Sequence, residues 1–219
     1  MQLIIAHRGD TQSFQENTLN AFISAFDKGA NGVEMDIQLW KNEIILVHDY
    51  LFDHSATYPT LLEILSAIHN RGRLEIEIKE MEPTILKPLE EILLLYPKSD
   101  IELTTSEIPL LPLIKKNISD RPAGMNISTN FFEDWMTNDL VTKKILGWAS
   151  MLQVDVIHLP FLNAQRCGSE NLVQLLHTAG FRVHIHIPTD GNQKNNFLEI
   201  STWNIDQCSI DDLSLIKAI

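Results

Sequence analysis

Four successive apolar segments near the start of this chain each end in side chains that can move protons or bind a metal. These side chains are His7 and Arg8 after the first segment, Glu34 and Asp36 in the second, His48 after the third, and Glu77 and Lys79 in the fourth. Two histidines, three carboxylates and two cationic groups form a set that suits metal-assisted attack on a phosphate ester.

The carboxylates predict a metal site. Glu34 and Asp36 stand two positions apart in a strand-like segment, so their side chains point to the same face. Buried carboxylates are costly unless they are paired or bind a metal, and Glu77 adds a third oxygen ligand from another segment. We therefore expect one divalent cation, Mg, Mn or Ca, at Glu34, Asp36 and Glu77. The alternative for the first two is a strand whose polar side faces water.

The histidines predict acid–base catalysis. His7 and His48 each end an apolar segment, and histidine titrates near neutral pH, so the two can act as base and acid on opposite sides of a phosphorus atom. Arg8 can bind phosphate oxygens through its planar guanidinium, and Lys79 adds a positive charge on the strand face of the third acid. Asp49 either orients His48 or caps the following loop.

Strand-like and helix-like segments alternate along the chain, which is typical of a parallel sheet with crossover helices. The expected strands are 3–6, 32–39, 43–48, 73–79, 100–105, 122–127, 154–159, 182–187 and 206–210. The expected helices are 18–28, 60–72, 84–96, 138–150 and 169–179. Every reactive group named above follows or ends a strand, as in a (β/α)8 barrel. We predict a (β/α)8 TIM barrel that forms a single domain over residues 1–219.

Nine candidate strands compete for the eight positions of such a barrel. The connection between 32–39 and 43–48 is too short for a crossover helix. Either these two segments form an irregular hairpin, or a later segment lies outside the barrel. A doubly wound open sheet is the alternative fold, but it would place its site at a switch point between adjacent loops.

The composition restricts location and partners. A net charge of −12 argues against nucleic acid as a partner, because phosphate backbones are bound by clusters of Lys and Arg. No apolar run approaches the ~18 residues of a transmembrane helix, so we expect none. Neither a basic nor a long apolar segment precedes His7, so we expect no secretory signal. Two cysteines, Cys167 and Cys208, are too few for a disulfide framework and favour the cytoplasm.

Together these elements resemble the glycerophosphodiester phosphodiesterase family. The family pattern has an HRG, a PENT-like element, a G-x-E-x-D strand, an HD and an E-x-K. Here they stand, in the same order and at the same spacing, as His7-Arg8-Gly9, Gln15-Glu16-Asn17-Thr18, Gly32 to Asp36, His48-Asp49 and Glu77-Ile78-Lys79. The resemblance covers roughly the first 80 residues, and a match of several elements is far more specific than one short motif.

The resemblance implies a barrel of the phospholipase C-like phosphodiesterase type that cleaves glycerophosphodiesters to glycerol 3-phosphate and an alcohol. The only partner it implies is this small-molecule substrate. Carried over by position, the residues are His7 and His48 as the acid–base pair, Glu34, Asp36 and Glu77 as metal ligands, Arg8 and Lys79 as phosphate contacts, and Glu16 and Asn17 as residues that brace the substrate site. The alternatives are a lysophospholipase D-like enzyme acting on lysolipids and a catalytically degenerate ligand-binding barrel.

The chain departs from the family pattern in several places. The usual insertion between the HD and E-x-K elements is nearly absent, which predicts a more open site. The family's tryptophan-containing strand carries His184 and His186 instead, for which we expect structural roles. The family's closing Thr-Asp element survives only as Ile210-Asp211, and of the two roles open to Asp211, this element or a cap of the last helix, we favour the cap. We expect His158 near the surface and Trp135, Trp148 and Trp203 in packing.

Overall fold

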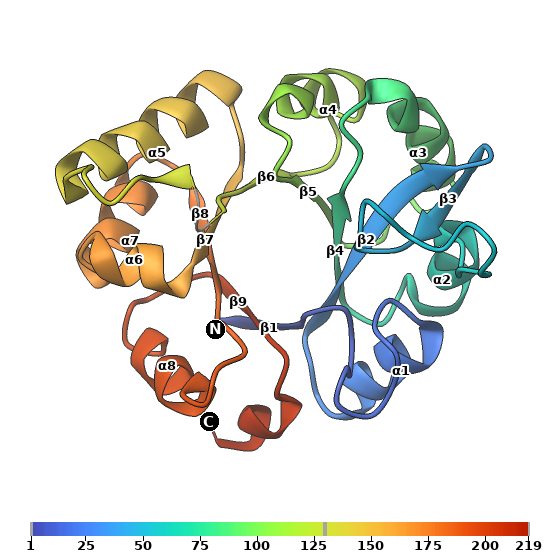
Figure 1. The fold of residues 1–219 in the computed structure, drawn as a ribbon, viewed down its shortest axis with the longest axis horizontal. Coiled ribbons are helices and arrows are strands. Elements are labelled where there is room, and N and C mark those ends of the chain that lie inside the picture. Colours follow the sequence, from blue (N-terminus) through green and yellow to red (C-terminus); the bar gives the residue numbers. More distant parts are fainter. Residues whose placement is uncertain (1, 129–130, 219) are drawn as a thin grey trace.

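Nine short segments form the strands of one sheet in the computed structural model, which describes residues 2–128 and 131–218. They are β1 (Leu3–Ala6), β2 (Gly32–Trp40), β3 (Glu43–Leu46), β4 (Arg73–Ile78), β5 (Ile101–Thr105), β6 (Ala123–Asn126), β7 (Val156–Pro160), β8 (Arg182–His186) and β9 (Gln207–Ile210). All except β3 run parallel, and β1 pairs with both β2 and β9, so the sheet closes on itself (Figure 1). The predicted (β/α)8 barrel is confirmed, and an open doubly wound sheet is excluded.

The ninth strand belongs to a hairpin. β3 pairs antiparallel with β2, with Trp40 opposite Glu43, and stands at the end of the strand order. It therefore lies outside the barrel. Of the two interpretations of the extra segment, the hairpin is correct.

Helices surround the barrel on its outer side (Figure 1). They are α1 (Leu19–Asp27), α2 (Leu61–Ile68), α3 (Leu86–Leu93), α4 (Leu111–Asn117), α5 (Asn138–Leu152), α6 (Phe161–Arg166), α7 (Glu170–Thr178) and α8 (Gln193–Ile200), with 3-10 turns η1 (Pro83–Ile85), η2 (Ile108–Leu110) and η4 (Leu213–Ala218). The sequence did not predict α4, α6 and α8, which have 7, 6 and 8 residues. Within the described ranges no helix is both long and apolar enough to cross a membrane.

Local sequence determines where these helices begin. At α2, the Thr60 side chain accepts from the backbone N–H of Glu63 at 3.3 Å, and the Glu63 carboxylate accepts from the backbone N–H of Thr60 at 2.8 Å. This reciprocal capping box satisfies two N–H groups that the first turn leaves free. The helix then buries Leu61, Ile64 and Leu65 completely or nearly so, and each such side chain contributes about 1.5–3 kcal/mol by leaving water.

A glycine makes room for a side chain inside the barrel. A Cβ on Gly124 of β6 would lie 2.7 Å from Nε2 of His158 and 3.0 Å from Cγ2 of Thr104. We expect Gly124→Ala to destabilise the protein by about 1–3 kcal/mol, because the imidazole would have to shift within a filled interior. Urea-induced unfolding of the two proteins measures the difference.

Gly147→Ala is the matched control. Gly147 lies in α5, where an added Cβ would meet nothing within 4 Å. This change should stabilise the protein by about 0.5–1 kcal/mol, since Ala has the higher helix propensity. A Gly124→Ala protein as stable as the wild type would contradict the close packing at β6.

Candidate active site

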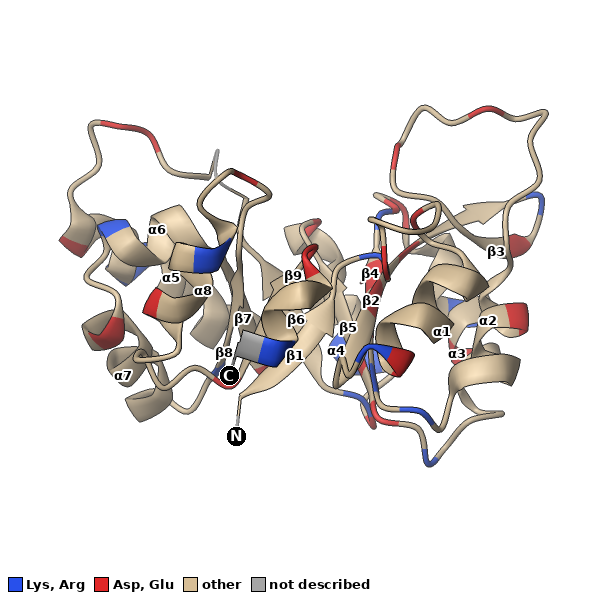
Figure 2. Cartoon of the chain, turned by 90° about the horizontal axis from the view of Figure 1, so that it is seen from below, with Lys and Arg blue, Asp and Glu red and all other residues tan. Residues whose placement is uncertain are grey.

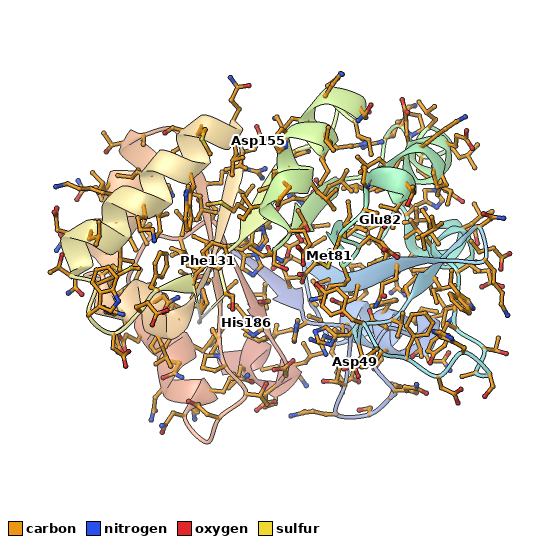
Figure 3. The ribbon with its side chains drawn as sticks, turned by 45° about the horizontal axis from the view of Figure 1, so that its top comes forward. Asp49, Met81, Glu82, Phe131, Asp155 and His186 are labelled. Carbon is orange, nitrogen blue, oxygen red and sulfur yellow. The ribbon has the colours of Figure 1, made fainter. Side chains whose placement is uncertain are left out.

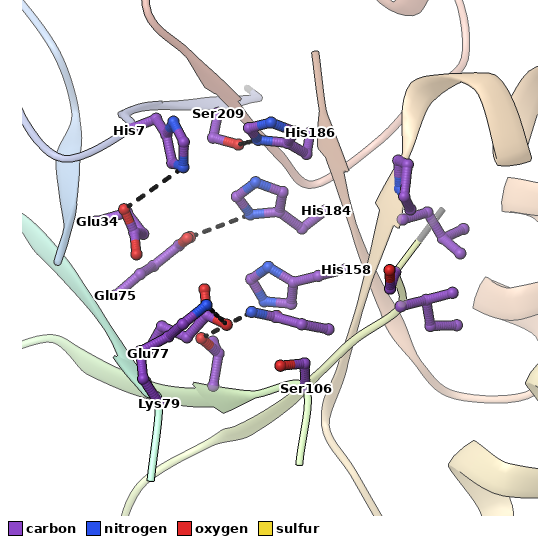
Figure 4. Close-up of a pocket in the computed structure, with 16 residues that line it drawn as sticks. His7, Glu34, Glu75, Glu77, Lys79, Ser106, His158, His184, His186 and Ser209 are labelled. Carbon is purple, nitrogen blue, oxygen red and sulfur yellow. Dashed lines mark hydrogen bonds and ion pairs between the residues drawn. The ribbon is translucent and has the colours of Figure 1, made fainter. Parts of the chain in front are cut away.

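The carboxyl ends of the barrel strands surround a cavity of about 330 Å³. Four of the residues predicted from the sequence line it, namely His7 after β1, Glu34 of β2, Glu77 of β4 and Lys79 directly after β4. Figure 4 shows these side chains on one side of the cavity and the imidazoles of three further histidines on the other. Inward-pointing positions of β2 and β4 alternate along each strand, so the two-residue spacing places the acids together.

The three carboxylates predicted as metal ligands lie close together. One oxygen each from Glu34, Asp36 and Glu77 lie within 4.8 Å of one another, and Asp36 is the register partner of Glu77 across β2 and β4. Oε1 of Glu34 and Oδ1 of Asp36 are buried without a hydrogen-bond partner among the described residues. Buried acceptors in this state are costly, and a divalent cation with oxygen ligands would satisfy them. The residues present therefore fit such a cation.

The electrostatics of the acids agree with this fit. Burial, followed by the charges of Asp36 and Glu77, raises the pKa of Glu34 well above its ordinary value, although Arg8 acts in the opposite direction. Three carboxylates face only two cationic side chains here. A bound divalent cation would offset the excess negative charge and keep all three acids ionised.

The loop after β1 takes its shape from two left-handed residues. Arg8 has a φ of 56° and Gly9 a φ of 88°, and a Cβ on Gly9 would lie 2.7 Å from the Cβ of Ala21. Glycine is needed at this position for both reasons. The resulting turn allows the backbone N–H of Arg8 to donate to Oε2 of Glu34 at 3.1 Å. The HRG element therefore contacts the acids through a main-chain hydrogen bond as well as through the Arg8 side chain.

Glu16 and Asn17 contact other site residues. Nη1 of Arg8 donates to Oε2 of Glu16 at 3.0 Å, and Nε of Arg8 lies 3.1 Å from Oδ2 of Asp36. Nδ2 of Asn17 donates to Oδ2 of Asp36 at 2.9 Å, while its Oδ1 accepts from the Asp36 backbone N–H at 3.0 Å. Asn17 and Arg8 therefore both contact Oδ2 of Asp36, and its Oδ1 lies 4.0 Å from Nζ of Lys79.

His7 is oriented by a residue from the far end of the chain. Its Nδ1 lies 2.9 Å from Oδ1 of Asp211, and its Nε2 lies 4.0 Å from Oε2 of Glu34. Burial raises the pKa of Asp211, but the hydrogen bond and charge of His7 outweigh it and lower that pKa to about 2. The expectation that Asp211 caps the last helix is wrong, because its carboxylate binds the imidazole. Asp212 instead accepts from the backbone N–H of Ser214 at 3.0 Å.

His48 occupies a neighbouring hollow. It does not line the central cavity but a space of about 750 Å³ that it shares with Glu16, Asn17 and Tyr58. Its Nδ1 lies 2.9 Å from Oδ1 of Asp49, so Asp49 orients the ring, as one of its two predicted roles requires. The structure thus gives each of the two predicted histidines a carboxylate at Nδ1, but the two line different cavities.

A second polar cluster lies deeper in the barrel. Nε2 of His158 lies 2.7 Å from Oε1 of Glu102, and Nδ1 of His184 lies 3.2 Å from Oε1 of Glu75. Arg73 donates to Glu102 at 2.7 Å. His158 is buried, so the expectation that it lies near the surface is wrong. For Glu75 alone a signal was present in the sequence, because Glu75 has the same parity as Glu77 along β4 and so shares its face.

This deeper cluster is complete without an ion. Glu75, His158 and His184 bring possible ligand atoms within 4.8 Å. However, the two imidazole rings are stacked, with centroids 4.2 Å apart and planes 20° apart. Nitrogen lone pairs lie in the ring plane, so those of stacked rings run side by side rather than converge. Hydrogen bonds to Glu102 and Glu75 instead occupy one nitrogen of each ring.

A third inward histidine, His186, touches the site. Its ring packs edge-on against His7, with centroids 4.7 Å apart, and its Nδ1 lies 2.8 Å from Oγ of Ser209. Burial, followed by the charge of His7, lowers the pKa of His186 to about 3, so the ring is neutral. Figure 3 shows His186 among the strands near the centre of the barrel.

Acidic side chains also gather around the mouth of the barrel. Figure 2 shows Asp and Glu on the two loops that rise beyond the strand ends, one after β3 and one after β6. They are Asp49 and Asp53 in the first loop and Glu133 and Asp134 in the second. Trp135 in the second loop is 72% exposed, so its expected packing role is wrong. A phosphate group can bind here only where Arg8, Lys79 or a cation supplies local positive charge.

A closed (β/α)8 barrel with acids and histidines at its strand ends has the general arrangement of a TIM-barrel enzyme site. Over residues 7–60 the chain matches the model of the glycerophosphoryl diester phosphodiesterase family. The glycerophosphodiester phosphodiesterase of Caldanaerobacter subterraneus is 44% identical over 54 residues, which are 24% of this chain and 22% of the relative. That of Bacillus altitudinis is 44% identical over 64 residues, 29% of this chain and 26% of the relative. The alignments span about a quarter of the length of these curated relatives.

Solved structures extend the likeness over the whole fold. A glycerophosphodiester phosphodiesterase from Thermotoga maritima superposes with a TM-score of 0.77 at 18% identity, covering 100% of this chain and 98% of that one. A phosphodiesterase from Oleispira antarctica, in complex with the product sn-glycerol-3-phosphate, gives 0.81 at 18% identity, covering 100% and 96%. At this identity the likeness shows the fold alone. With the family match, it confirms the resemblance predicted from the sequence.

The deeper cluster predicts a pH dependence of stability. Burial, followed by the charge of Glu102, raises the pKa of Glu75 above its ordinary 4.5. The folded state therefore holds this proton more tightly than the unfolded chain, and the associated stability is lost as the pH rises through the raised pKa. In Glu75→Gln the side-chain carbonyl still accepts from His184 and Gln207. The free energy of unfolding of this variant should therefore fall less than that of the wild type between about pH 5 and about pH 8. Urea unfolding across this range measures it.

Glu102→Gln is the contrasting variant. Burial raises the pKa of Glu102, but the hydrogen bond from His158 and the charges of Arg73 and Arg182 lower it overall to about 2. Removing this charge leaves Arg73 without its buried partner and should cost about 3–5 kcal/mol near neutral pH. An unchanged pH slope in Glu75→Gln would show that Glu75 does not hold its proton more tightly in the fold.

Proposed function

We propose that this protein is a metal-dependent phosphodiesterase that hydrolyses glycerophosphodiesters to glycerol 3-phosphate and an alcohol. The observation that carries this proposal is the trio of Glu34, Asp36 and Glu77 beside His7, whose ring a carboxylate orients. Two buried oxygens of the trio have no donor in the described part of the chain. The family match over residues 7–60 supports it, as does the product bound in the Oleispira antarctica neighbour.

Glu34, Asp36 and Glu77 would hold one divalent cation, Mg, Mn or Ca, since all three offer oxygen ligands. When bound, the cation stabilises negative charge on the phosphoryl oxygens. Lys79, which lines the cavity, would contact the phosphate directly, and Arg8 would do so from the adjoining loop. Glu16 and Asn17 would brace Arg8 and Asp36 through the hydrogen bonds described above.

His7 and His48 would share the proton transfers. Their Nδ1 atoms face Asp211 and Asp49, so each carboxylate accepts the Nδ1 proton and leaves Nε2 free to exchange one. One imidazole takes the proton of the attacking hydroxyl, from water or from the glycerol itself, as the hydroxyl oxygen bonds to phosphorus. The other gives a proton to the alcohol oxygen as the second P–O bond breaks. Attack by the glycerol hydroxyl gives a cyclic phosphate, which water then opens to glycerol 3-phosphate.

The same chemistry on lysolipids, as in a lysophospholipase D-like enzyme, and a barrel that binds its ligand without turnover are the alternatives to this function. Substrate range and turnover separate the three. The cytoplasmic location predicted from the two cysteines stays a prediction; Cys167 and Cys208 are both free thiols.

The first test is release of glycerol 3-phosphate from glycerophosphodiesters with Mg, Mn or Ca added, and with EDTA. We expect turnover with at least one ion and none in EDTA. His48→Ala should lower kcat by about 10²–10⁴-fold because it removes a proton-transfer group, while calorimetry should show unchanged cation binding. Asp36→Asn should weaken cation binding itself. His177→Ala in α7 is the matched control and should change neither quantity.

Each alternative has its own outcome. Turnover that persists in EDTA would overturn the metal requirement. Turnover of lysolipids but not of glycerophosphodiesters would identify the lysophospholipase D-like enzyme. Cation and phosphate binding without any turnover would identify a degenerate barrel.

Asp211 is expected to act as a positioning residue through His7. Asp211→Asn keeps an acceptor for Nδ1–H but removes the charge that stabilises the protonated ring. We expect kcat to fall about 10–10²-fold with little change in KM. Asp212→Asn is the control, because Asp212 caps Ser214 rather than binding His7. Equal effects of the two substitutions would show that Asp211 does not act through the histidine.

A further inference from the structure

The central cavity has two chemically different walls. One wall carries the acids, His7 and Lys79 from β1, β2 and β4. In Figure 4 the opposite wall presents His158, His184 and His186, with Ser106 and Ser209 beside them. Cation and phosphate would occupy the first wall, so the alcohol that leaves the phosphate meets the second.

The second wall is built to hydrogen-bond. It offers two serine hydroxyls, the Asn126 amide and the neutral ring of His186. Nδ2 of Asn126 donates to Oγ1 of Thr104 at 3.4 Å, but its Oδ1 is buried without a hydrogen-bond partner among the described residues. A buried acceptor in this state favours a ligand that brings a donor.

Other alcohols fit this wall less well. Quaternary ammonium groups are bound by the faces of aromatic rings, and none of the described residues lining the cavity is Phe, Tyr or Trp. An acyl chain needs a continuous apolar surface, whereas only Ile127, Leu159 and Pro160 of the lining residues are apolar. The volume of about 330 Å³ is also at the low end of the roughly 300–1,000 Å³ of small-molecule sites.

We propose that the alcohol released by this protein is a small polyol, a neutral group with at least two free hydroxyls such as glycerol, recognised by Asn126 and Ser106 on the wall opposite the acids. This inference rests on the proposed phosphodiesterase function and names its substrate class. The polyol hydroxyls donate to Oδ1 of Asn126 and exchange hydrogen bonds with Ser106 and with the ring of His186.

The test compares kcat/KM for three substrates of the wild type and variants in the metal that supports turnover. The substrates are glycerophosphoglycerol, glycerophospho-1-propanol, which lacks only the two free headgroup hydroxyls, and glycerophosphocholine. We expect the wild type to prefer the glycerol ester over the propanol ester by about 10- to 100-fold. Asn126→Leu should remove most of this preference by lowering the glycerol ester alone.

Two further variants keep the test decisive. Asn195→Leu, at an exposed position of α8, is the matched control and should leave all three values unchanged. If Asn126→Leu fails to fold, as judged by thermal melting, Ser106→Ala should reduce the same preference by about 3- to 10-fold.

The outcomes separate the two proposals. A wild type that prefers the choline or propanol ester overturns the polyol class and leaves the phosphodiesterase function intact. If Asn126→Leu lowers kcat/KM equally for all three substrates, the glycerol arm that they share, and not the leaving alcohol, lies on this wall. This result would also overturn the polyol class. No turnover of any ester with any metal overturns the proposed function and this inference with it.

Discussion

The cost of burying carboxylates governs the mouth of this barrel. An ionised carboxylate away from water costs several kcal/mol unless charges and donors surround it. Asn17 donates a hydrogen bond to one oxygen of Asp36, which also forms an ion pair with Arg8, and the backbone N–H of Arg8 donates to Glu34. These contacts leave two buried oxygens, Oε1 of Glu34 and Oδ1 of Asp36, without a donor among the described residues. The left-handed turn of the HRG element supplies one donor, the register of β2 against β4 places Asp36 beside Glu77, and the expected cation would satisfy the oxygens that remain.

The barrel interior contains two polar layers, and the number of available donors distinguishes them. In the deeper layer, Glu102 receives hydrogen bonds from Arg73, His158 and Gln207, so every charge has a partner. In the upper layer each acid has a donor, but one oxygen of Glu34 and one of Asp36 have no hydrogen-bond partner among the described residues. Natural proteins satisfy most buried polar groups, and the exceptions concentrate where ligands bind. The deeper layer therefore stabilises the fold, and the upper layer is the one arranged to accept a cation and a substrate.

The sequence predicted what depends on local spacing and missed what depends on distant partners. Two-residue alternation was enough to bring Glu34, Asp36 and Glu77 together, and strand-like patterns located the barrel strands to within two residues. The role of Asp211 depends on His7, 204 residues away in sequence, and it becomes visible only because β1 pairs with β9. His158 was misplaced for the same reason, since its partner Glu102 lies on another strand. Neither pairing leaves a periodic signal.

The two walls of the cavity also differ in how far the family match covers them. The segment that matches the family model, residues 7–60, contributes His7, Glu34 and Asp36, and the E-x-K strand follows shortly after. The opposite wall comes from β5 to β9, outside that segment, where only the fold is shared at 18% identity with the solved structures. Side chains on that wall can change without disturbing strand pairing, because they point into the cavity. The choice of alcohol therefore depends on residues such as Asn126, which the family match does not include, rather than on the groups that handle the phosphate.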